Sequence, residues 1–242
     1  MIVPIAKKTP KAQKSREQIL QAAFTLFREK GYEETSMREI AREAEMAVGA
    51  AYYYFRTKDE MILEIYSRTQ RESEIQNRTT CSETRSFRKR ISTLLFYRLG
   101  LIAEHRKLFV VLTQKGINPS NPLSPFSRET ANLRKGAVRL IEDAIEGSDL
   151  KISSTLRPIL PQLLWFFQMA VILFWALDTS REQERTRRLV EVSLNLMVPL
   201  FGMSLLPLAG IFNRLVVELH GLLNTLIQEG VAEPSPQTAQ SE

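Results

Sequence analysis

The stretch that decides the fold runs from residue 31 to residue 58 and reads GYEETSMREIAREAEMAVGAAYYYFRTK. Its residue spacing predicts two short helices joined by a tight turn, with the second helix crowded with tyrosines and ending at a lysine. Small residues at the start of a helix let its backbone approach another molecule closely, and phenols at its end supply hydroxyl donors. These features favour contact with a DNA groove over a catalytic pocket.

A further helix precedes this stretch. Its apolar residues recur at i, i+3, i+4, i+7 and i+8, which places them on one helical face. They are Ile19, Ala22, Ala23, Leu26 and Phe27. Gly31 follows Lys30, an arrangement typical of a helix end whose next residue is left-handed.

The second helix is predicted to begin at Thr35 or Ser36. Ser36 and Glu39 have the spacing of a capping box, in which each side chain satisfies the backbone amide of the other residue. Unpaired amides at such a helix start also form a phosphate site. Arg38 stays off the apolar stripe, where it is within reach of a base or a phosphate. The residues expected to be buried are Met37, Ile40, Ala41 and Ala44.

After a turn near Glu45, a third helix is predicted over residues 47–55. Its first residues are small, and Val48 and Ala50 are suited to contact thymine methyl groups. Tyrosines occupy positions 52–54 and must point in three directions around the helix. At least one of them packs inward, while the others donate hydroxyls to phosphates, contacts that position a protein without reading sequence. Lys58 adds a charge that neutralises phosphate.

The alternative interpretation is a buried aromatic cluster in an ordinary helical bundle. Three adjacent side chains cannot all lie on one face of a helix, so this interpretation does not account for the three tyrosines. DNA binding also explains Ser36, Arg38 and Lys58 together.

Three motifs in this region resemble the DNA-binding domain of the TetR family of bacterial transcriptional regulators. They are an Ile-Leu-x-Ala-Ala-x-x-Leu-Phe helix at 19–27, Gly-Tyr-x-x-Thr-Ser-x-x-x-Ile-Ala at 31–41 and Gly-x-x-Tyr-Tyr-x-Phe-x-x-Lys at 49–58. The resemblance covers about a quarter of the chain. It implies that Thr35, Ser36, Tyr53 and Lys58 hold phosphates, and that Arg38, Val48, Ala50 and Tyr52 lie nearest the bases. The full set of expected DNA-binding residues is Thr35, Ser36, Arg38, Ala47, Val48, Gly49, Ala50, Tyr52, Tyr53, Tyr54 and Lys58.

The chain departs from the family pattern at two positions. Glu45 stands where the family usually has glycine, and Tyr54 stands where it often has histidine. We expect Glu45 to adopt a left-handed backbone at a cost of about 1 kcal/mol relative to glycine. Tyr54 keeps the aromatic character of the motif.

Composition sets outer limits on function. The 242 residues carry a net charge of +6, which fits an anionic partner. Basic residues between positions 7 and 16 precede the first acidic residue and predict a flexible arm, either a solubilising tail or a DNA backbone contact. One cysteine and two distant histidines provide no metal-binding pattern, and no phosphate loop or nucleophile motif is present. We therefore expect neither an enzyme nor a cofactor, and an N-terminus unlike a signal peptide favours a cytoplasmic protein.

The rest of the sequence predicts more helices. They are expected at about 58–77, 83–103, 106–115, 127–146 and 208–228, with a proline-rich loop at 118–125. Two segments, 158–177 and 192–213, contain no charged residue and are long enough to span a bilayer. They indicate either a membrane hairpin or two antiparallel helices buried inside the subunit and against a partner subunit. We favour the second, without a membrane, because a helix-turn-helix domain of this type acts as a dimer and the prolines shorten the second apolar run.

The sequence therefore predicts an all-α protein with an N-terminal three-helix DNA-binding domain and a larger helical domain for ligand binding and dimerisation. The expected parts are a basic arm at 1–13, the helix-turn-helix domain at 14–74, the second domain at 75–229 and a flexible tail at 230–242. The resemblance implies a homodimeric repressor of a palindromic operator on double-stranded DNA, released by a small apolar inducer. Candidate ligand contacts, each equally compatible with plain core packing, are Phe96, Tyr97, Phe109, Trp165, Phe166 and Gln168.

Overall fold

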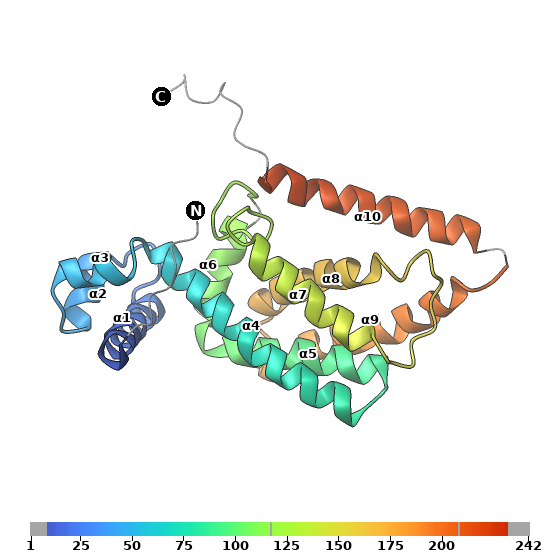
Figure 1. The fold of residues 1–242 in the computed structure, drawn as a ribbon, viewed down its shortest axis with the longest axis horizontal. Coiled ribbons are helices and arrows are strands. Elements are labelled where there is room, and N and C mark those ends of the chain that lie inside the picture. The colour runs from blue at the N-terminus through green and yellow to red at the C-terminus, as the bar shows by residue number, and fades with distance from the viewer. Residues whose placement is uncertain (1–8, 117, 208, 232–242) are drawn as a thin grey trace, which may run out of the picture.

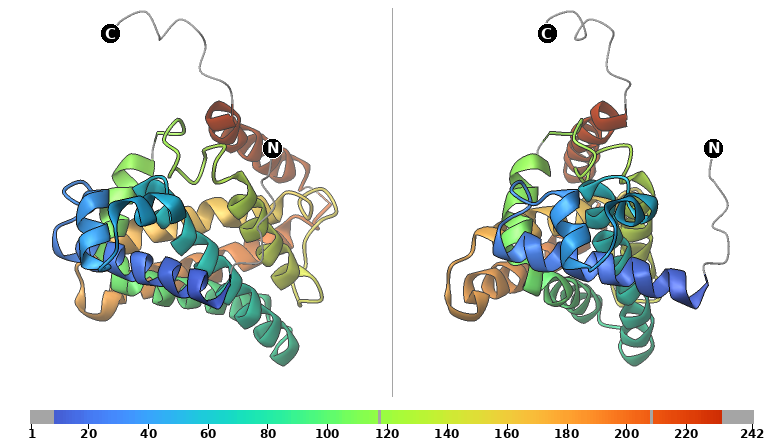
Figure 2. Two further views of the ribbon diagram at one scale, coloured as in Figure 1. Left: turned by 60° about the vertical axis from the view of Figure 1, so that its left-hand side comes forward. Right: turned by 90° about the vertical axis from the view of Figure 1, so that its left-hand side faces the viewer.

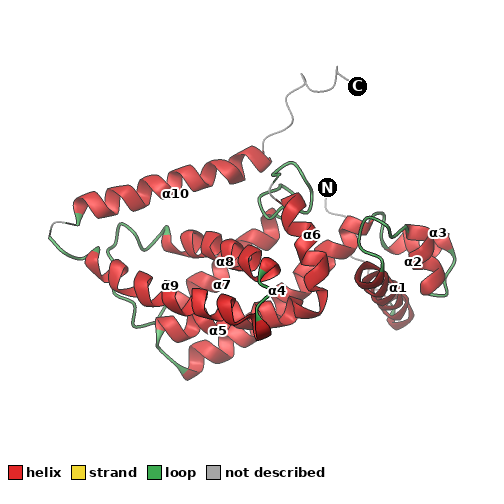
Figure 3. Cartoon of the chain, turned by 180° about the vertical axis from the view of Figure 1, so that it is seen from behind, coloured by secondary structure: helices red, strands yellow, loops and turns green. Residues whose placement is uncertain are grey.

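The computed structural model describes residues 9–116, 118–207 and 209–231, and every regular element in these ranges is a helix (Figure 3). The predicted all-α fold is therefore confirmed. The α-helices are α1 (Pro10–Glu29), α2 (Met37–Glu43), α3 (Val48–Tyr54), α4 (Lys58–Glu83), α5 (Phe87–Ile102), α6 (Arg106–Gly116), α7 (Ala131–Ile145), α8 (Leu160–Leu177), α9 (Glu184–Met203) and α10 (Gly210–Val231). Two short 3-10 helices, η1 (Ala103–His105) and η2 (Arg181–Gln183), precede α6 and α9.

Helices α1, α2 and α3 form a small unit at one end of the molecule (Figure 1). Helix α4 begins beside this unit and continues into a larger bundle with α5, α7, α8 and α9, while α10 runs along one edge of the bundle (Figures 1 and 2). The domain boundary predicted between residues 74 and 75 therefore falls inside a continuous helix.

The small unit has its own apolar core. The predicted stripe on α1, from Ile19 to Phe27, is buried, and it packs against Ile40 of α2 and Ala51 of α3. Two residues of α6, Leu108 and Leu112, belong to this same core. Helix α6 therefore contacts the small unit directly, which the sequence pattern did not predict.

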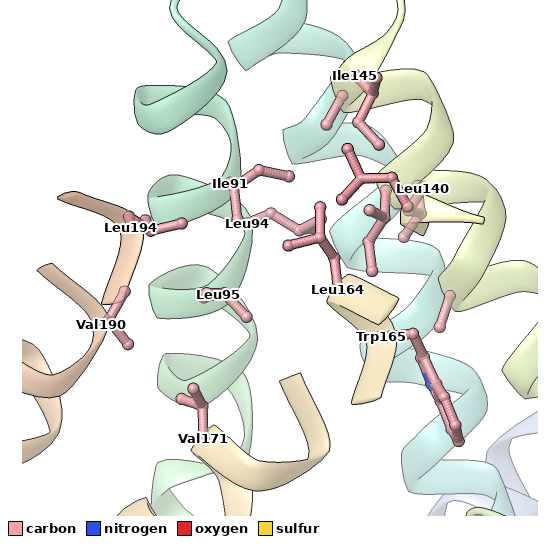
Figure 4. Close-up of a cluster of buried hydrophobic side chains, with 14 of the residues drawn as sticks. Ile91, Leu94, Leu95, Leu140, Ile145, Leu164, Trp165, Val171, Val190 and Leu194 are labelled. Carbon is pink, nitrogen blue, oxygen red and sulfur yellow. The ribbon is translucent and has the colours of Figure 1, made fainter. Parts of the chain in front are cut away.

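The larger bundle surrounds a second core (Figure 4). Helix α5 contributes Leu94 and Leu95 from its centre, and α8 contributes Leu164 and Trp165 from the opposite side. Val190 of α9 closes the cluster along its edge. Because α8 packs against α6, α7 and α9, about half of its charge-free sequence is buried inside the protein.

A buried cation near the start of α5 joins the ends of α4 and α7. Arg90 of α5 donates to the carbonyl oxygens of Cys81 and Thr84 at the end of α4, at 2.7 Å each. It also donates to the carbonyls of Ala144 and Glu146 at the end of α7, at 3.3 and 2.6 Å. Helix C-termini carry unpaired carbonyls and partial negative charge, so a guanidinium satisfies both helices at once.

Several predicted boundaries differ from the structure. Helix α1 begins at Pro10 with Thr9 as its cap, so the last residues of the predicted arm are helical; positions 1–8 lie outside the described residues. Helix α4 extends six residues beyond Asn77. Pro199 lies inside α9, and the chain leaves the helix only at Ser204, so the charge-free segment 192–213 is not one helix. Helix α10 ends at Val231, inside the predicted tail, and positions 232–242 are outside the described residues.

One helix in the described ranges, α8, is long and apolar enough to cross a membrane, and half of its residues are buried within the protein. Its faces contact neighbouring helices of the bundle. Since the second charge-free segment is divided between α9 and α10, the two segments do not form a helical hairpin of matching length.

Candidate nucleic-acid interface and ligand cavity

The start of α2 has the predicted capping box. The Oγ of Ser36 accepts a hydrogen bond from the amide of Glu39 at 3.2 Å, and the Oε2 of Glu39 accepts from the amide of Ser36 at 2.9 Å. Lys30 pairs with the same carboxylate at 2.6 Å. The hydrogen bond from Lys30, followed by those from Ser36, holds the pKa of Glu39 at about 2. These contacts fix the orientation of α2 relative to the end of α1.

The turn between α2 and α3 is a Schellman motif. The amide of Met46 donates to the carbonyl of Ala41 at 2.9 Å, and the amide of Glu45 donates to the carbonyl of Arg42 at 3.0 Å. Glu45 has a φ of 53°, in the left-handed region that favours glycine. The predicted left-handed backbone at Glu45 is confirmed, and the helix-turn-helix geometry is retained despite the missing glycine.

Helix α3 presents one side to the core and the other to solvent. Ala51 and Phe55 are buried, while Tyr54 is half-buried against the same core. Tyr53 is 82% exposed and Tyr52 is 48% exposed. The three tyrosines therefore point in different directions.

The surface around α3 gathers most of the residues predicted to contact DNA. Ala47, Val48 and Gly49 are exposed at the start of the helix, and Ala50 is half-buried. On the preceding helix, Ser36 and Arg38 are also exposed. Because α3 lies at the free end of the molecule, this surface is not covered by the larger domain (Figure 1).

Thr35 and Lys58 have structural roles that the motif does not reveal. Thr35 is 1% exposed, and its hydroxyl donates to the carbonyl of Gly31 at 2.7 Å. The hydroxyl of Thr35 closes the turn between α1 and α2, and the contact of Thr35 with phosphate stays a prediction. The ammonium of Lys58 donates to the carbonyl of Tyr32 at 2.6 Å and lies 4.5 Å from the centre of its ring. Lys58 thus connects the first turn of α4 to the loop between α1 and α2.

Four charged side chains fasten α1 to α4. Arg68 of α4 donates to Glu17 of α1 at 2.9 Å, and Arg16 of α1 pairs with Glu64 of α4 at 2.7 Å. Arg68 also pairs with Glu64 at 3.3 Å, which joins the two pairs into one network. Movement of α4 would therefore carry α1 and the rest of the small unit with it.

A cavity of about 370 Å³ lies in the larger domain. Its walls come from α4, α5, α6, α7 and α8 and from the segment 123–130 between α6 and α7, with one contribution from α10. Among the predicted ligand contacts, Phe109, Trp165, Phe166 and Gln168 line it. Phe96 and Tyr97 do not, because α5 turns Arg98 and Ile102 toward the cavity and directs those two rings elsewhere.

Both charged residues of the cavity and one of its glutamines were not among the predicted ligand contacts. They are Gln70 of α4, Arg98 of α5 and Arg134 of α7. A signal for Arg98 exists in the sequence: it lies four residues from both Leu94 and Ile102, on the buried stripe of its helix. A charge on an apolar stripe indicates a polar site inside a core.

Tyr66 of α4 connects the cavity with the small unit. It lines the cavity and packs against both apolar cores. Its neighbour Phe109 of α6 also lines the cavity, while Leu108 and Leu112 of the same helix lie in the core of the small unit. Helices α4 and α6 therefore each touch both the cavity and the helix-turn-helix unit.

An exposed helix-turn-helix unit joined to a helical domain with an internal cavity defines a class of bacterial regulatory proteins. The family model described as bacterial regulatory proteins, tetR family, matches residues 19–65. The model described as the C-terminal domain of tetracyclin repressor-like proteins matches residues 90–216, more than half of the chain. The chain belongs to the TetR family of transcriptional regulators.

Curated relatives align mainly through the N-terminal region. The transcriptional regulator AcrR of Shigella flexneri is 40% identical over 63 residues, which cover 26% of this chain and 29% of AcrR. The regulator HbdR of Aromatoleum is 44% identical over 50 residues, 21% of this chain and 22% of HbdR. The chain thus matches less than a third of the length of these relatives.

Solved structures share the fold over a longer range. A putative TetR-family regulator from Syntrophomonas wolfei has a TM-score of 0.62 and 16% identity, covering 81% of this chain and 98% of that one. FadR of Bacillus subtilis, solved with stearoyl-CoA, has a TM-score of 0.58 and 20% identity, covering 75% and 97%. At these identities the similarity establishes the fold alone.

Proposed function

We propose that this protein is a homodimeric repressor that binds a palindromic operator through α3 and releases it when a small molecule occupies the cavity. The observation that carries the proposal is the exposed face of α3 on a rigid three-helix unit. A helix of this kind enters the major groove with its first residues at the base edges. The protein would act on DNA in the cytoplasm, without a chemical reaction of its own.

The contacts with DNA divide into two kinds. Val48, Ala50 and Tyr52 of α3, together with Arg38 of α2, would lie nearest the bases and discriminate among operators. Ser36 and Tyr53 would contact phosphates, where exposed hydroxyls position the protein without reading sequence. Lys58, held by the loop before α2, adds positive charge beside the backbone of the operator.

Exposed apolar side chains in the second domain support a homodimer. Helix α9 leaves Val192 and Leu196 exposed on one face, one turn apart, while Val190 and Leu194 face the core. Helix α8 ends with Leu177 exposed. Further exposed apolar residues on α10 are Ile211, Leu215, Leu219 and Leu222. Exposed apolar side chains in such number favour a protein interface, and a two-fold dimer would present two α3 helices to a palindrome.

Coupling between ligand and DNA would pass through α4 and α6. A molecule in the cavity would contact Tyr66 and Phe109, which belong to helices that also pack on the small unit. A displacement of α4 would move α1 through the network of Glu17, Glu64 and Arg68. A coupling free energy of about 1–3 kcal/mol changes operator affinity roughly 5- to 150-fold.

The cavity fits an apolar ligand. Its lining is dominated by aromatic and aliphatic side chains, and its volume of about 370 Å³ lies within the range of small-molecule sites. Two structural neighbours are FadR proteins solved with acyl-CoA molecules, stearoyl-CoA in Bacillus subtilis and lauroyl-CoA in Thermus thermophilus. The acyl chains of those ligands are apolar, as we propose for the part of the inducer that lies in this cavity.

Selection of bound duplexes from a random pool tests the proposal. The full chain, without added small molecule and at low ionic strength, should enrich a palindrome with half-sites about one helical turn apart. A variant with Tyr53→Ala and Arg38→Ala should enrich nothing. Recovery of a random, non-palindromic population by the unaltered protein would contradict the proposal.

A further inference from the structure

The cavity contains two cationic side chains among its apolar walls. Arg98 of α5 and Arg134 of α7 both line it. Within the described part of the chain, neither makes an ion pair with a carboxylate. Buried guanidinium groups are ordinarily paired with an anion, because an uncompensated charge in an apolar environment is unfavourable.

The hydrogen bonds of the two arginines go to neutral groups. Nη1 of Arg98 donates to Oε1 of Gln70 at 3.1 Å. The amide nitrogen of Gln70 donates in turn to Glu74 at 3.3 Å, so an amide lies between Arg98 and that carboxylate. Nη1 of Arg134 donates to the carbonyls of Pro125 and Ser127 at 2.7 and 3.1 Å. Burial lowers the pKa of both guanidinium groups, that of Arg98 to about 10.

Gly136 makes room for this arrangement. A Cβ atom at that position would lie 3.1 Å from the amide nitrogen of Gln70. The glycine of α7 therefore lets the Gln70 side chain occupy the space between α4 and α7, where it orients Arg98. Helices α4, α5 and α7 thus hold the guanidinium group in place before any ligand arrives.

Gln168 supplies a further polar group in the same cavity. Its side chain is 1% exposed, and neither its amide nitrogen nor its amide oxygen has a hydrogen-bond partner among the described residues. Buried amides without partners are rare in folded proteins and indicate a missing ligand or water. Gln168 lies on α8, a different wall from Arg98, so polar residues from separate helices line the same cavity.

We propose that the cavity binds an amphiphilic acid, whose oxyanion head pairs with Arg98 beside Arg134 while its apolar body lies against the aromatic walls. This inference rests on the proposed function, for which it names the class of inducer. A guanidinium group binds carboxylate or phosphate through two parallel hydrogen bonds. The acid must enter the cavity itself, because both arginines lie among its lining residues. A CoA thioester would place an uncharged carbonyl there.

Titration calorimetry with four dodecyl compounds tests the proposal on the full chain. The probes are dodecanoate, dodecyl phosphate, 1-dodecanol and dodecanoyl-CoA. We expect at least one of the two free acids to bind roughly tenfold to a hundredfold more tightly than the alcohol, as a charge-assisted hydrogen bond provides. Tighter binding of dodecanoate would identify the head group of the inducer as a carboxylate, and tighter binding of dodecyl phosphate would identify it as a phosphate.

Variants assign the preference to Arg98. Arg98→Met should abolish the preference for acid over alcohol, because the affinity for the acids falls to about that for the alcohol. Arg98→Lys, which keeps the positive charge, should retain part of the preference for acid over alcohol. Arg139→Met is the matched control, because Arg139 lies exposed on α7 outside the cavity lining. A circular-dichroism melt of each variant separates loss of folding from loss of binding.

Four outcomes would overturn the inference: equal affinity for acids and alcohol, an acid preference that survives in Arg98→Met, binding of the CoA thioester alone, or binding of none of the probes. None of them alters the operator selection described above, which uses no small molecule. Conversely, if the acid binds as expected but the protein selects no palindrome, the cavity assignment stands and the proposed DNA function fails.

Discussion

The ring of Tyr66 in α4 lies 6.0 Å from the ring of Phe109 in α6, centre to centre, at the wall of the cavity. Both helices continue from this contact into the core of the helix-turn-helix unit, α4 through Met61 and Ile62 and α6 through Leu108 and Leu112. An occupant of the cavity that separated or rotated the two rings would therefore displace both helices under the DNA-binding unit.

Replacing Tyr66 with Ala should weaken the coupling between the cavity and DNA. With a saturating concentration of whichever dodecyl acid binds more tightly, the unaltered protein should lose operator affinity about 5- to 150-fold. Tyr66→Ala should lose markedly less, because the contact between α4 and α6 is gone, although it still binds the acid. Ile75→Ala is the control, since Ile75 is exposed on the same helix. An undiminished response in Tyr66→Ala, measured by fluorescence anisotropy, would show that coupling takes another route.

Removing the hydroxyl of Tyr53 should weaken DNA binding uniformly. A hydrogen bond contributes about 0.5–1.5 kcal/mol, so Tyr53→Phe should lose roughly two- to tenfold in affinity for every sequence. Tyr97→Phe, in the larger domain, should have no effect. Lys58→Ala should also flatten the dependence of log affinity on log salt by about one unit if Lys58 neutralises a phosphate. An affinity loss confined to one operator sequence would instead place Tyr53 at a base.

Glycine at position 45 should stabilise the protein. Glu45 has a φ of 53°, and a non-glycine residue in this region is disfavoured by about 1 kcal/mol. Glu45→Gly should therefore raise the free energy of unfolding by about that amount. Glu43→Gly, the same change in the last turn of α2, should lower it by about 1 kcal/mol. Urea unfolding of both variants measures the difference, and equal destabilisation would indicate that the turn at Glu45 is not strained.

Arg90 should be essential for the packing of α4 against α7. It is 4% exposed and donates to four carbonyl oxygens at the ends of these helices. Arg90→Met leaves those carbonyls unpaired and should destabilise the protein by about 3 kcal/mol. Lys89→Met, at an exposed neighbouring position, should change stability by less than about 0.5 kcal/mol. Similar melting temperatures for the two variants would contradict this role.

Asp178 should make stability depend on acid pH. Burial alone raises the pKa of Asp178, but hydrogen bonds from Ser180 and Thr186, at 2.7–2.9 Å, hold it well below its usual range. Because the folded pKa is depressed, this stabilisation is complete above about pH 4 and is lost as the pH falls below that value. Asp178→Asn should be less stable at pH 7 and show a flatter stability profile below pH 4. A profile as steep as that of the unaltered protein would assign the acid sensitivity to other carboxylates.

Local signals in the sequence predicted the helix-turn-helix unit well. The capping box of Ser36 and Glu39, the left-handed Glu45 and the buried stripe of α1 each depend on residues close in sequence, and all are present. The roles of Thr35 and Lys58 were missed for a different reason. Both side chains bind backbone carbonyls of the loop before α2, and only the folded loop brings those carbonyls within reach.

The cavity was harder to predict, because it forms where five helices meet. Periodicity shows which side of α5 is buried, but it does not show that the neighbouring helices leave space beside Arg98 rather than beside Phe96 or Tyr97. The convergence of Arg98, Arg134 and Gln168 requires the packing of α5, α7 and α8. Spacing within one helix contains no information about that packing.

The affinity of the ligand-free full chain for its selected palindrome, compared with a scrambled duplex of equal length, tests the central claim most directly. Fluorescence anisotropy at physiological salt should show binding at least about 10³-fold tighter to the palindrome, the lower range for specific recognition. If the two duplexes bind equally, α3 does not read bases in the major groove, and the proposed repressor function is wrong.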